Sequence, residues 1–361
     1  MRVFQVINSF GFESGGAERI ALQLHLDLQE KEMDMHLVGL EPCQTDRLNH
    51  ATSLGLDSPY DLRAIFRLAK YLKHQLRPGD IVHGHLFPTS FYLAILIRIG
   101  LIKNPCLFTE HSTYNRRRKY RIFKVLDKQI YSTFSEIAAI SLGTKNALTE
   151  YLPKTHSKVQ TVFNGSVLKF KDFPERLSSS EKFTIISVGR LTAAKNYDTL
   201  LHALSDLTHV PFECRIFGEG DQRQRLESLS EELGLAHCIR FMGYITDLTP
   251  HLRAADMFVT PSKWEGFGLA VVEAMNAGLP VIASDIPGLR EVTGPNGKSA
   301  CLVPPNNASA LRNAIKRMYE LPLERQRLAA EGFKRSKKFS NNNMAEAYLK
   351  LYTDTLNAYN E

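Results

Sequence analysis

Cysteine is scarce in this sequence, and its spacing excludes two common uses of the residue. Five cysteines are scattered along the 361 residues: Cys43, Cys106, Cys214, Cys238 and Cys301. No two of them stand in C-x-x-C spacing, so the sequence predicts neither a disulfide framework nor a cysteine zinc site. Such usage favours a reducing cytoplasm.

Long apolar runs, repeats and low-complexity tracts are missing as well. The longest apolar stretch, 91–102, is interrupted by Arg98, and a bilayer span needs about 20 residues, so this stretch predicts a buried helix. The stretch 1–12 lacks the apolar core of a signal peptide, and we expect no cleaved leader. Without a fixed-period repeat, a solenoid is excluded.

The composition is that of a globular protein with an excess of positive charge. Apolar residues make up 43% and charged residues 23% of the chain, which leaves ample material for a core. The length predicts two domains of roughly 150 to 200 residues. A net charge of +7 favours an anionic partner, whether nucleic acid, nucleotide phosphates or a membrane.

Short β-branched runs alternate with amphipathic segments, and the alternation occurs twice. The first series has strands at 2–7, 35–40, 80–86, 106–111, 136–141 and 159–163, with helices at 17–31, 61–77, 88–100, 120–134 and 143–152. The second has strands at 183–189, 213–218, 239–243, 257–262, 280–284 and 301–305, with helices at 197–207, 221–234 and 268–277. This pattern predicts an α/β protein with two Rossmann-like domains and a cleft between them.

The domain boundaries follow from the break in that alternation. We predict a first domain over 1–165, a linker over 166–182 and a second domain over 183–340. Apolar residues at helical spacing predict a last amphipathic helix within 341–361. Periodicity leaves two alternatives open for this helix, which either docks on the second domain or packs back on the first.

The stretch KWEGFGLAVVEAM (263–275) follows a predicted strand and begins a predicted helix. We expect the backbone amides of its glycine turn to face a ligand, namely those of Gly266, Phe267, Gly268 and Leu269. Glu265 and Glu273 would project into the same space. A carboxylate accepts hydrogen bonds from vicinal hydroxyls, so the pair predicts a nucleotide-sugar site. The alternative, a solvated Glu265 and a surface Glu273, is weak for Glu273 because its helical neighbours are apolar.

A second strand-end loop carries two cations. In SVGRLTAAKN (187–196), Arg190 and Lys195 precede the next helix. An arginine fork and a lysine point charge on one loop suit a diphosphate. A solvated basic loop is the competing interpretation, more so for Lys195 alone than for the pair.

Glycine and histidine give weaker signals in the first half. Gly15 and Gly16 lie in a glycine-rich loop after the first strand that matches no standard phosphate-binding pattern. His83 and His85 lie two apart on one strand, but two ligands without a third do not make a metal site. We expect His83 in the core, and His85 and His111 near the cleft.

A basic run at 116–124 interleaves six cations with aromatic residues. The cations are Arg116, Arg117, Arg118, Lys119, Arg121 and Lys124. Such a run favours nucleic acid or an anionic membrane surface. The alternative for some of these charges is a solvated helix start.

The ordered motifs resemble the retaining, two-domain GT-B glycosyltransferases of family 4, group 1 type. The resemblance rests on GGAE (15–18), VFNG (162–165), VGRL with KN (188–196), FGEGD (217–221) and the E-x7-E stretch from Glu265 to Glu273. Ala194 and the NGSV of the linker depart from the family's frequent residues.

The resemblance implies a role for each site residue. Arg190 and Lys195 would hold the donor diphosphate, and Glu273 would bind the ribose. Glu265 and the amides of Phe267, Gly268 and Leu269 would hold the transferred sugar. Gly15 and Gly16 would close over phosphates and acceptor, while His85 would orient the sugar or acceptor.

The resemblance also implies a reaction. We expect a cytoplasmic, peripheral membrane enzyme that passes a sugar from a nucleotide diphosphate donor to a saccharide or lipid-linked saccharide, in polysaccharide or lipopolysaccharide biosynthesis. No metal or cofactor is expected. The membrane is the expected partner of the 116–124 run, and nucleic acid is disfavoured. Two other functions stay open: a nucleotide-sugar epimerase, and a non-catalytic sugar-nucleotide or nucleic-acid-binding protein.

Overall fold

The computed structural model describes residues 1–11, 15–43, 46, 48–113, 115–166, 172–174, 182–207, 210–294 and 297–361. These residues form two compact units, Met1–Gly165 with Asn341–Glu361, and Ser166–Ser340. The predicted linker, 166–182, lies mostly outside the described residues. The last helix, α13 (Asn341–Asn360), belongs to the first unit.

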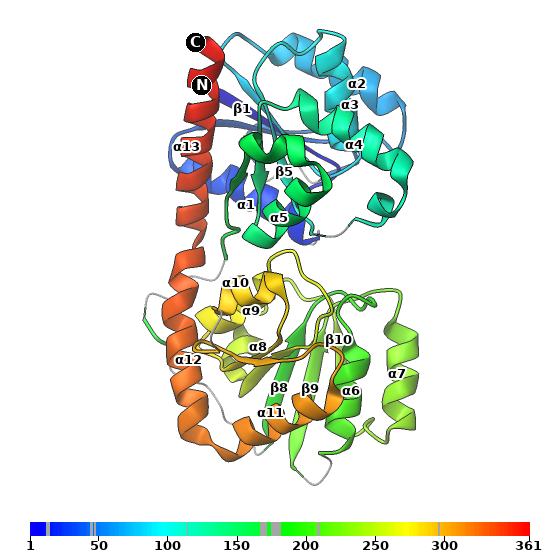
Figure 1. The fold of residues 1–361 in the computed structure, drawn as a ribbon, viewed down its shortest axis with the longest axis vertical. Helices are drawn as coiled ribbons and strands as arrows, with labels where there is room; N and C mark the ends of the chain where they lie inside the picture. Colours follow the sequence, from blue (N-terminus) through cyan, green and yellow to red (C-terminus); the bar gives the residue numbers. More distant parts are fainter. Residues whose placement is uncertain are drawn as a thin grey trace. The chain divides into compact units, whose positions relative to one another are not determined.

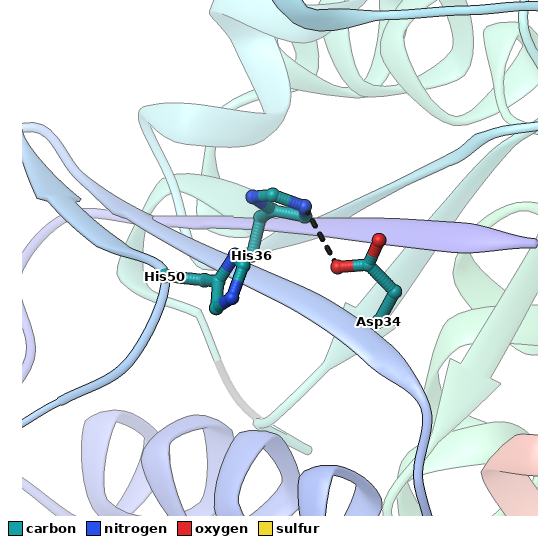
Figure 2. A group of neighbouring side chains, drawn as sticks. All are labelled: Asp34, His36 and His50. Atoms are coloured by element: carbon teal, nitrogen blue, oxygen red, sulfur yellow. Dashed lines mark ion pairs between the residues drawn. The ribbon is translucent and has the colours of Figure 1, made fainter.

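The first unit is built on a seven-stranded parallel sheet with the strand order β3-β2-β1-β4-β5-β6-β7. Its strands are β1 (Arg2–Ile7), β2 (Asp34–Gly39), β3 (Ala51–Ser53), β4 (Ile81–His85), β5 (Cys106–Glu110), β6 (Glu136–Ala139) and β7 (Val159–Thr161). The helices between them are α1 (Gly16–Glu30), α2 (Arg63–Gln75), α3 (Thr89–Arg98), η1 (Arg116–Lys119), α4 (Arg121–Thr133), α5 (Leu142–Tyr151) and η2 (Pro153–Lys158). At the open edge of the sheet, β2 and the turn before β3 bring Asp34, His36 and His50 together (Figure 2).

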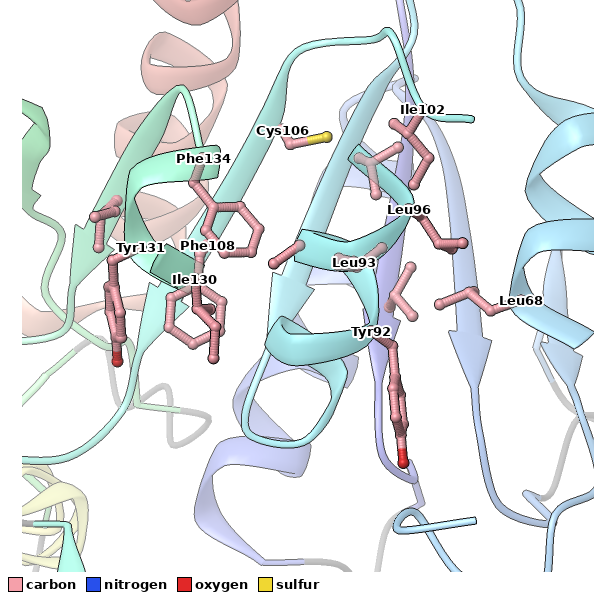
Figure 3. Packing of buried hydrophobic residues seen from close by; sticks show 14 of the residues in the cluster. Leu68, Tyr92, Leu93, Leu96, Ile102, Cys106, Phe108, Ile130, Tyr131 and Phe134 are labelled. Atoms are coloured by element: carbon pink, nitrogen blue, oxygen red, sulfur yellow. The ribbon is translucent and has the colours of Figure 1, made fainter. Parts of the chain in front are cut away.

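One face of this sheet packs on α2, α3 and α4. Alternate strand residues point to this face, and Figure 3 shows Phe108 of β5 beside Ile130 and Tyr131 of α4. The ring of Phe108 lies 5.3 Å from that of Phe134 and 5.6 Å from that of Tyr131. The apolar run 91–102 thus supplies α3, with Leu93 and Leu96 wholly buried, which confirms the predicted buried helix.

The opposite face is covered by α1 and α13, which lie side by side (Figure 1). Here His83 of β4 is fully buried, as predicted, and its ring nitrogens lie 2.7 Å from Tyr352 Oη of α13 and 2.7 Å from Thr109 Oγ1. Thr109 Oγ1 also lies 2.9 Å from Tyr348 Oη. Because these buried polar groups satisfy one another, they attach the C-terminal helix to the first sheet.

The second unit is built on a six-stranded parallel sheet with the order β10-β9-β8-β11-β12-β13. Its strands are β8 (Phe183–Val188), β9 (Phe212–Phe217), β10 (Ile239–Gly243), β11 (Met257–Thr260), β12 (Val281–Ser284) and β13 (Cys301–Val303). Its helices are α6 (Tyr197–Ser205), α7 (Arg223–Glu232), α8 (Thr249–Ala254), α9 (Leu269–Asn276), α10 (Pro287–Thr293), α11 (Ala308–Glu320), α12 (Pro322–Ser336) and η3 (Lys337–Phe339).

The two parallel sheets with helices on them confirm the predicted α/β fold class. Strand β3 and helices α8, α10, α11 and α12 are additions that the periodicity did not predict. Helix α12 packs on α9, where Asn276 Nδ2 donates to Ser336 Oγ at 3.2 Å. All five cysteines are free thiols. Within the described residues, none of the helices combines the length and apolarity that crossing a membrane requires.

Candidate active site

Each sheet reverses its strand order at one point, and the predicted site residues follow the strands that flank these points. In the second unit β8 lies beside β11, so the loops after Val188 and Thr260 leave the same edge of the sheet. In the first unit β1 lies beside β4, which brings the loop after Ile7 to the strand end that carries His85. Such switch points are where open α/β sheets bind ligands.

The two loops of the second unit meet through an ion pair. Lys195 Nζ pairs with Glu265 Oε1, and the two side chains are only 21% and 14% exposed. Ser262 Oγ donates to the same carboxylate oxygen at 3.0 Å. The backbone amide of Lys263 donates to the carbonyl of Ala194 at 2.8 Å. The structure therefore brings together Lys195, predicted for the diphosphate, and Glu265, predicted for the sugar, although 70 positions separate them in sequence.

Arg190 is exposed and stands on a turn that its neighbours hold in place. The amide of Leu191 donates to the carbonyl of Glu219 at 2.9 Å, in the loop after β9. At Gly220 a Cβ would lie 2.3 Å from the carbonyl oxygen of Leu191, so only glycine permits this approach. The FGEGD motif thus supports the Arg190 turn through its backbone.

Helix α9 begins directly after this pair of loops. Gly268 has φ 91° and precedes the first helical residue, Leu269. The side chain of Phe267 is buried, and its ring lies 5.4 Å from that of Phe339. A Cβ at Gly288 would lie 2.4 Å from the carbonyl oxygen of Glu265, so this glycine lets α10 lie against the site loop. Sequence reasoning missed Ser262 and Gly288, since neither belongs to a recognisable motif.

Glu273 lies one turn inside α9 and is 5% exposed. The alternative of a surface helix decorated by a glutamate is therefore wrong. A buried carboxylate is retained only with compensating partners or a ligand. Its predicted role with a ribose stays a prediction.

In the first unit, Gly15 caps α1 and Gly16 is its first residue. The carbonyl of Gly15 accepts from the amide of Arg19 at 2.9 Å, and a Cβ there would lie 2.8 Å from Glu18 Oε2. Apart from its chain neighbours and its own helix backbone, no heavy atom of the described residues lies within 4 Å of a Cβ placed at Gly16. Residues 12–14 of the same loop lie outside the described part of the chain.

His85 is wholly buried at the end of β4. Its Nδ1 lies 3.0 Å from His111 Nε2, and its Nε2 lies 3.3 Å from Gln5 Nε2. Burial lowers the pKa of His85 well below the usual value, and the neighbouring histidines lower it further. The imidazole of His85 is therefore neutral at ordinary pH. Its predicted role in orienting a substrate stays a prediction.

Two members of the basic run are not surface charges, which corrects the prediction for 116–124. Arg117 lies 3.0 Å from Asp127, with side-chain exposures of 11% and 0%. Arg118 lies 2.7 Å from Glu110, with exposures of 10% and 8%. The 3₁₀ turn η1 directs both guanidinium groups inward, toward carboxylates on α4 and β5.

The remaining part of the run keeps an exposed face, and the structure does not describe the side chain of Arg116. Lys119, Arg121 and Lys124 are exposed. Between them Tyr120 and Ile122 are 64% and 76% exposed. Cations interleaved with exposed apolar side chains are typical of surfaces that bind an anionic interface.

Two family descriptions match consecutive parts of the chain. Residues 14–169 match Glycosyltransferase Family 4, and residues 169–335 match Glycosyl transferases group 1. The chain belongs to the group 1, family 4 glycosyltransferases. The family predicted from the motifs is therefore confirmed, while the retaining mechanism stays a prediction.

Individual relatives agree with this family. An uncharacterised glycosyltransferase of Methanocaldococcus jannaschii is 30% identical over 59% of this chain and 59% of its own length. The lipopolysaccharide core biosynthesis glycosyltransferase LpsD of Rhizobium meliloti is 32% identical over 48% of this chain and 50% of its own length. The chain thus spans about half to three fifths of these curated relatives.

Among solved structures, Anabaena HepE in complex with UDP and glucose superposes with a TM-score of 0.84. It is 17% identical, and the match covers 98% of this chain and 100% of that one. This likeness confirms the two-domain fold of the family.

Proposed function

We propose that this glycosyltransferase moves a sugar from a nucleoside diphosphate donor to a saccharide or lipid-linked saccharide, with retention of the anomeric configuration, in cell-surface polysaccharide or lipopolysaccharide biosynthesis. The observation that carries the proposal is the meeting of Lys195 and Glu265 at the switch point of the second sheet. In this proposal Lys195 binds the diphosphate and Glu265 accepts hydrogen bonds from sugar hydroxyls, and the contact between the two side chains supports both roles. The similarity to LpsD, a lipopolysaccharide core biosynthesis glycosyltransferase, supports the pathway. The similarity in fold to HepE, which was solved in complex with UDP and glucose, supports the donor class.

In this proposal the charged residues act on the leaving diphosphate. Negative charge grows on the phosphate oxygens as the sugar leaves, and Arg190 and Lys195 supply two positive charges to that region. Glu265 and the amides at the start of α9 hold the sugar, while Glu273 holds the ribose. Transfer takes place on the face of the sugar that the leaving group vacates. Because the two cations balance the diphosphate, we expect transfer to continue in the presence of a chelator.

The first test is a panel of nucleotide sugars, read by thermal shift and then by product analysis. A donor that stabilises the wild type should release nucleoside diphosphate when an acceptor saccharide is added. The Lys195→Ala and Glu273→Ala variants should lose this turnover, whereas Lys298→Ala should keep it, because Lys298 is 75% exposed elsewhere on the same unit. Unchanged turnover in both site variants would refute the assignment.

The same experiment separates the enzymatic alternative. A nucleotide-sugar epimerase would convert the donor to an isomer without any acceptor. Analysis of the donor pool by chromatography detects that outcome directly. A non-catalytic binder would bind the donor and produce neither change.

We further propose that the enzyme works at the cytoplasmic face of an anionic membrane, through the exposed part of the basic run. Lys119, Arg121 and Lys124 carry the charge, and Tyr120 and Ile122 enter the interface. The double variant Arg121→Glu, Lys124→Glu should abolish binding to vesicles containing phosphatidylglycerol. Binding to RNA but not to such vesicles, with a strong salt dependence, would favour the nucleic-acid alternative instead.

A further inference from the structure

Asp34, His36 and His50, whose side chains are of types that can bind a metal ion, lie close together in the first unit and belong to none of the predicted site motifs. Asp34 and His36 lie two apart on β2, so both side chains project from the same face of the strand. His50 immediately precedes β3, and its carbonyl accepts from the amide of Leu37 at 2.9 Å. One ligand atom from each of the three residues lies within 4.8 Å of the other two (Figure 2).

The spacing within this group is close to that of ligands on one ion. His36 Nε2 lies 3.0 Å from Asp34 Oδ1. Two ligands on a tetrahedral zinc ion with bonds of about 2.0 Å lie roughly 3.3 Å apart. Although it is close to Asp34, the buried Nε2 of His36 makes no hydrogen bond of good geometry with any described residue. A metal ion placed between His36 Nε2 and Asp34 Oδ1 would bind both atoms.

The surroundings hold the ring of His36 in place beside Asp34. Its ring stacks on Phe4 with centroids 4.4 Å apart and planes within 9°. The nearby guanidinium of Arg2 is engaged by Asp80 at 2.6 Å, so it does not occupy Asp34.

We propose that Asp34, His36 and His50 bind one Zn²⁺ ion, with water as the fourth ligand. Two imidazoles and one carboxylate suit zinc better than magnesium or calcium, which prefer oxygen ligands alone. Asp34 is exposed and His50 is exposed, so their side chains rotate freely enough to close the remaining distance.

The position of the site indicates a structural role. Asp34 is the first residue of β2 and His50 precedes β3, so the site lies at the amino ends of these strands. The loop with Gly15 and Gly16 and the residue His85 lie at the carboxyl ends of β1 and β4. A zinc ion at the amino ends of the strands would link the segment that precedes β3 to β2. It would take no part in sugar transfer.

The test uses the full chain, stripped of metal with a chelator and titrated with Zn²⁺ in a calorimeter. The wild type should bind one equivalent, and its unfolding temperature should rise with zinc, because an ion bound only by the folded state stabilises it. Co²⁺ in place of zinc should give the visible absorption of a four-coordinate site.

Two conservative variants probe the ligands without disturbing the fold. Asp34→Asn keeps the shape of the side chain. His50→Asn keeps the backbone, because His50 has φ 56° and asparagine tolerates this region. Each should weaken zinc binding by at least about 100-fold, the upper range seen for mere outer-shell partners. His74→Asn is the control, because His74 is exposed on α2 of the same unit.

Two outcomes would overturn the proposal. One is the absence of saturable one-to-one zinc binding by the wild type. The other is equal zinc affinity in the wild type and in His50→Asn, which would place the ion elsewhere. Unfolding temperatures measured without zinc should be the same in the wild type and in all variants. Equal temperatures would show that a variant that no longer binds zinc has lost a ligand side chain and not its fold.

Discussion

Replacing Glu265 by glutamine should separate donor binding from sugar transfer. In the structure Glu265 pairs with Lys195, and both side chains are partly buried. If Lys195 binds the donor diphosphate as proposed, an incoming diphosphate must compete with this carboxylate for the lysine. A part-exposed ion pair is worth roughly 0.5 to 1 kcal/mol. Its removal in Glu265→Gln should tighten binding of a free nucleoside diphosphate by about two- to fivefold.

The transfer reaction should respond in the opposite direction. If Glu265 accepts a hydrogen bond from the transferred sugar, its loss removes a charged hydrogen bond worth about 1.5 to 3 kcal/mol. The value of kcat/KM should then fall by roughly 10- to 150-fold. Lys195→Gln differs, because it should weaken both nucleoside diphosphate binding and transfer. The contrast between the two variants assigns each residue its ligand.

The assay is calorimetric titration of the nucleoside diphosphate that binds tightest in a panel, paired with steady-state transfer rates. The wild type, Glu265→Gln, Lys195→Gln and the double variant complete a mutant cycle, and Lys298→Gln is the control on the same unit. Strong coupling is expected, since the two residues are in contact. Equal loss of diphosphate affinity in both single variants would refute the reasoning, because Glu265 would then support the donor rather than compete with it.

Three further predictions concern the fold around the sites. Arg118→Ala breaks a buried ion pair and should lower the free energy of unfolding by about 3 to 5 kcal/mol. Arg121→Ala, at an exposed position, should change this free energy by less than about 0.5 kcal/mol. Urea unfolding of the two variants measures the difference. Gly288→Ala puts a Cβ where the Glu265 carbonyl lies, so transfer should fall while the far-UV circular dichroism stays unchanged. Burial lowers the pKa of His111 to about 3, so the unfolded state takes up a proton below about pH 6.5 and the folded state does not. The contribution of His111 to the free energy of unfolding should be fully present above about pH 6.5 and should be lost as the pH falls toward 3, by at most about 1.4 kcal/mol per pH unit. In the His111→Gln variant, the plot of unfolding free energy against pH should therefore be flatter over this range.

Periodicity was sufficient to predict most strands and the loops that follow them. The strand at 183–189 and the strand at 257–262 were both placed from β-branched runs, and the structure has them as β8 and β11. The order of strands in the sheet is a tertiary property that no local pattern contains. For this reason the sequence predicts Lys195 and Glu265 as ligands of different parts of a donor and does not predict the ion pair between them.

The basic run illustrates a second limit of local reasoning. Six cations in nine residues predict a solvated or anion-binding surface when each is counted alike. The structure turns Arg117 and Arg118 toward Asp127 and Glu110, and one of these carboxylates lies on a neighbouring strand. Whether a charge is buried depends on a partner that the run itself does not contain. The membrane hypothesis therefore rests on a smaller and more specific set of side chains than the sequence suggested.

The proposed zinc site shows the same dependence on pairing. Asp34 and His36 are visible in the sequence as two ligands on one face of a strand, which by themselves indicate nothing. The third ligand is supplied by register: Leu37 pairs with Ala51, so His50 stands next to β2. Strand β3 has only three residues, too few for any alternation to reveal it. A metal site of this kind is therefore found only after the edge of the sheet is known, whereas the proposed donor site, whose residues lie in sequence motifs, can be predicted before it.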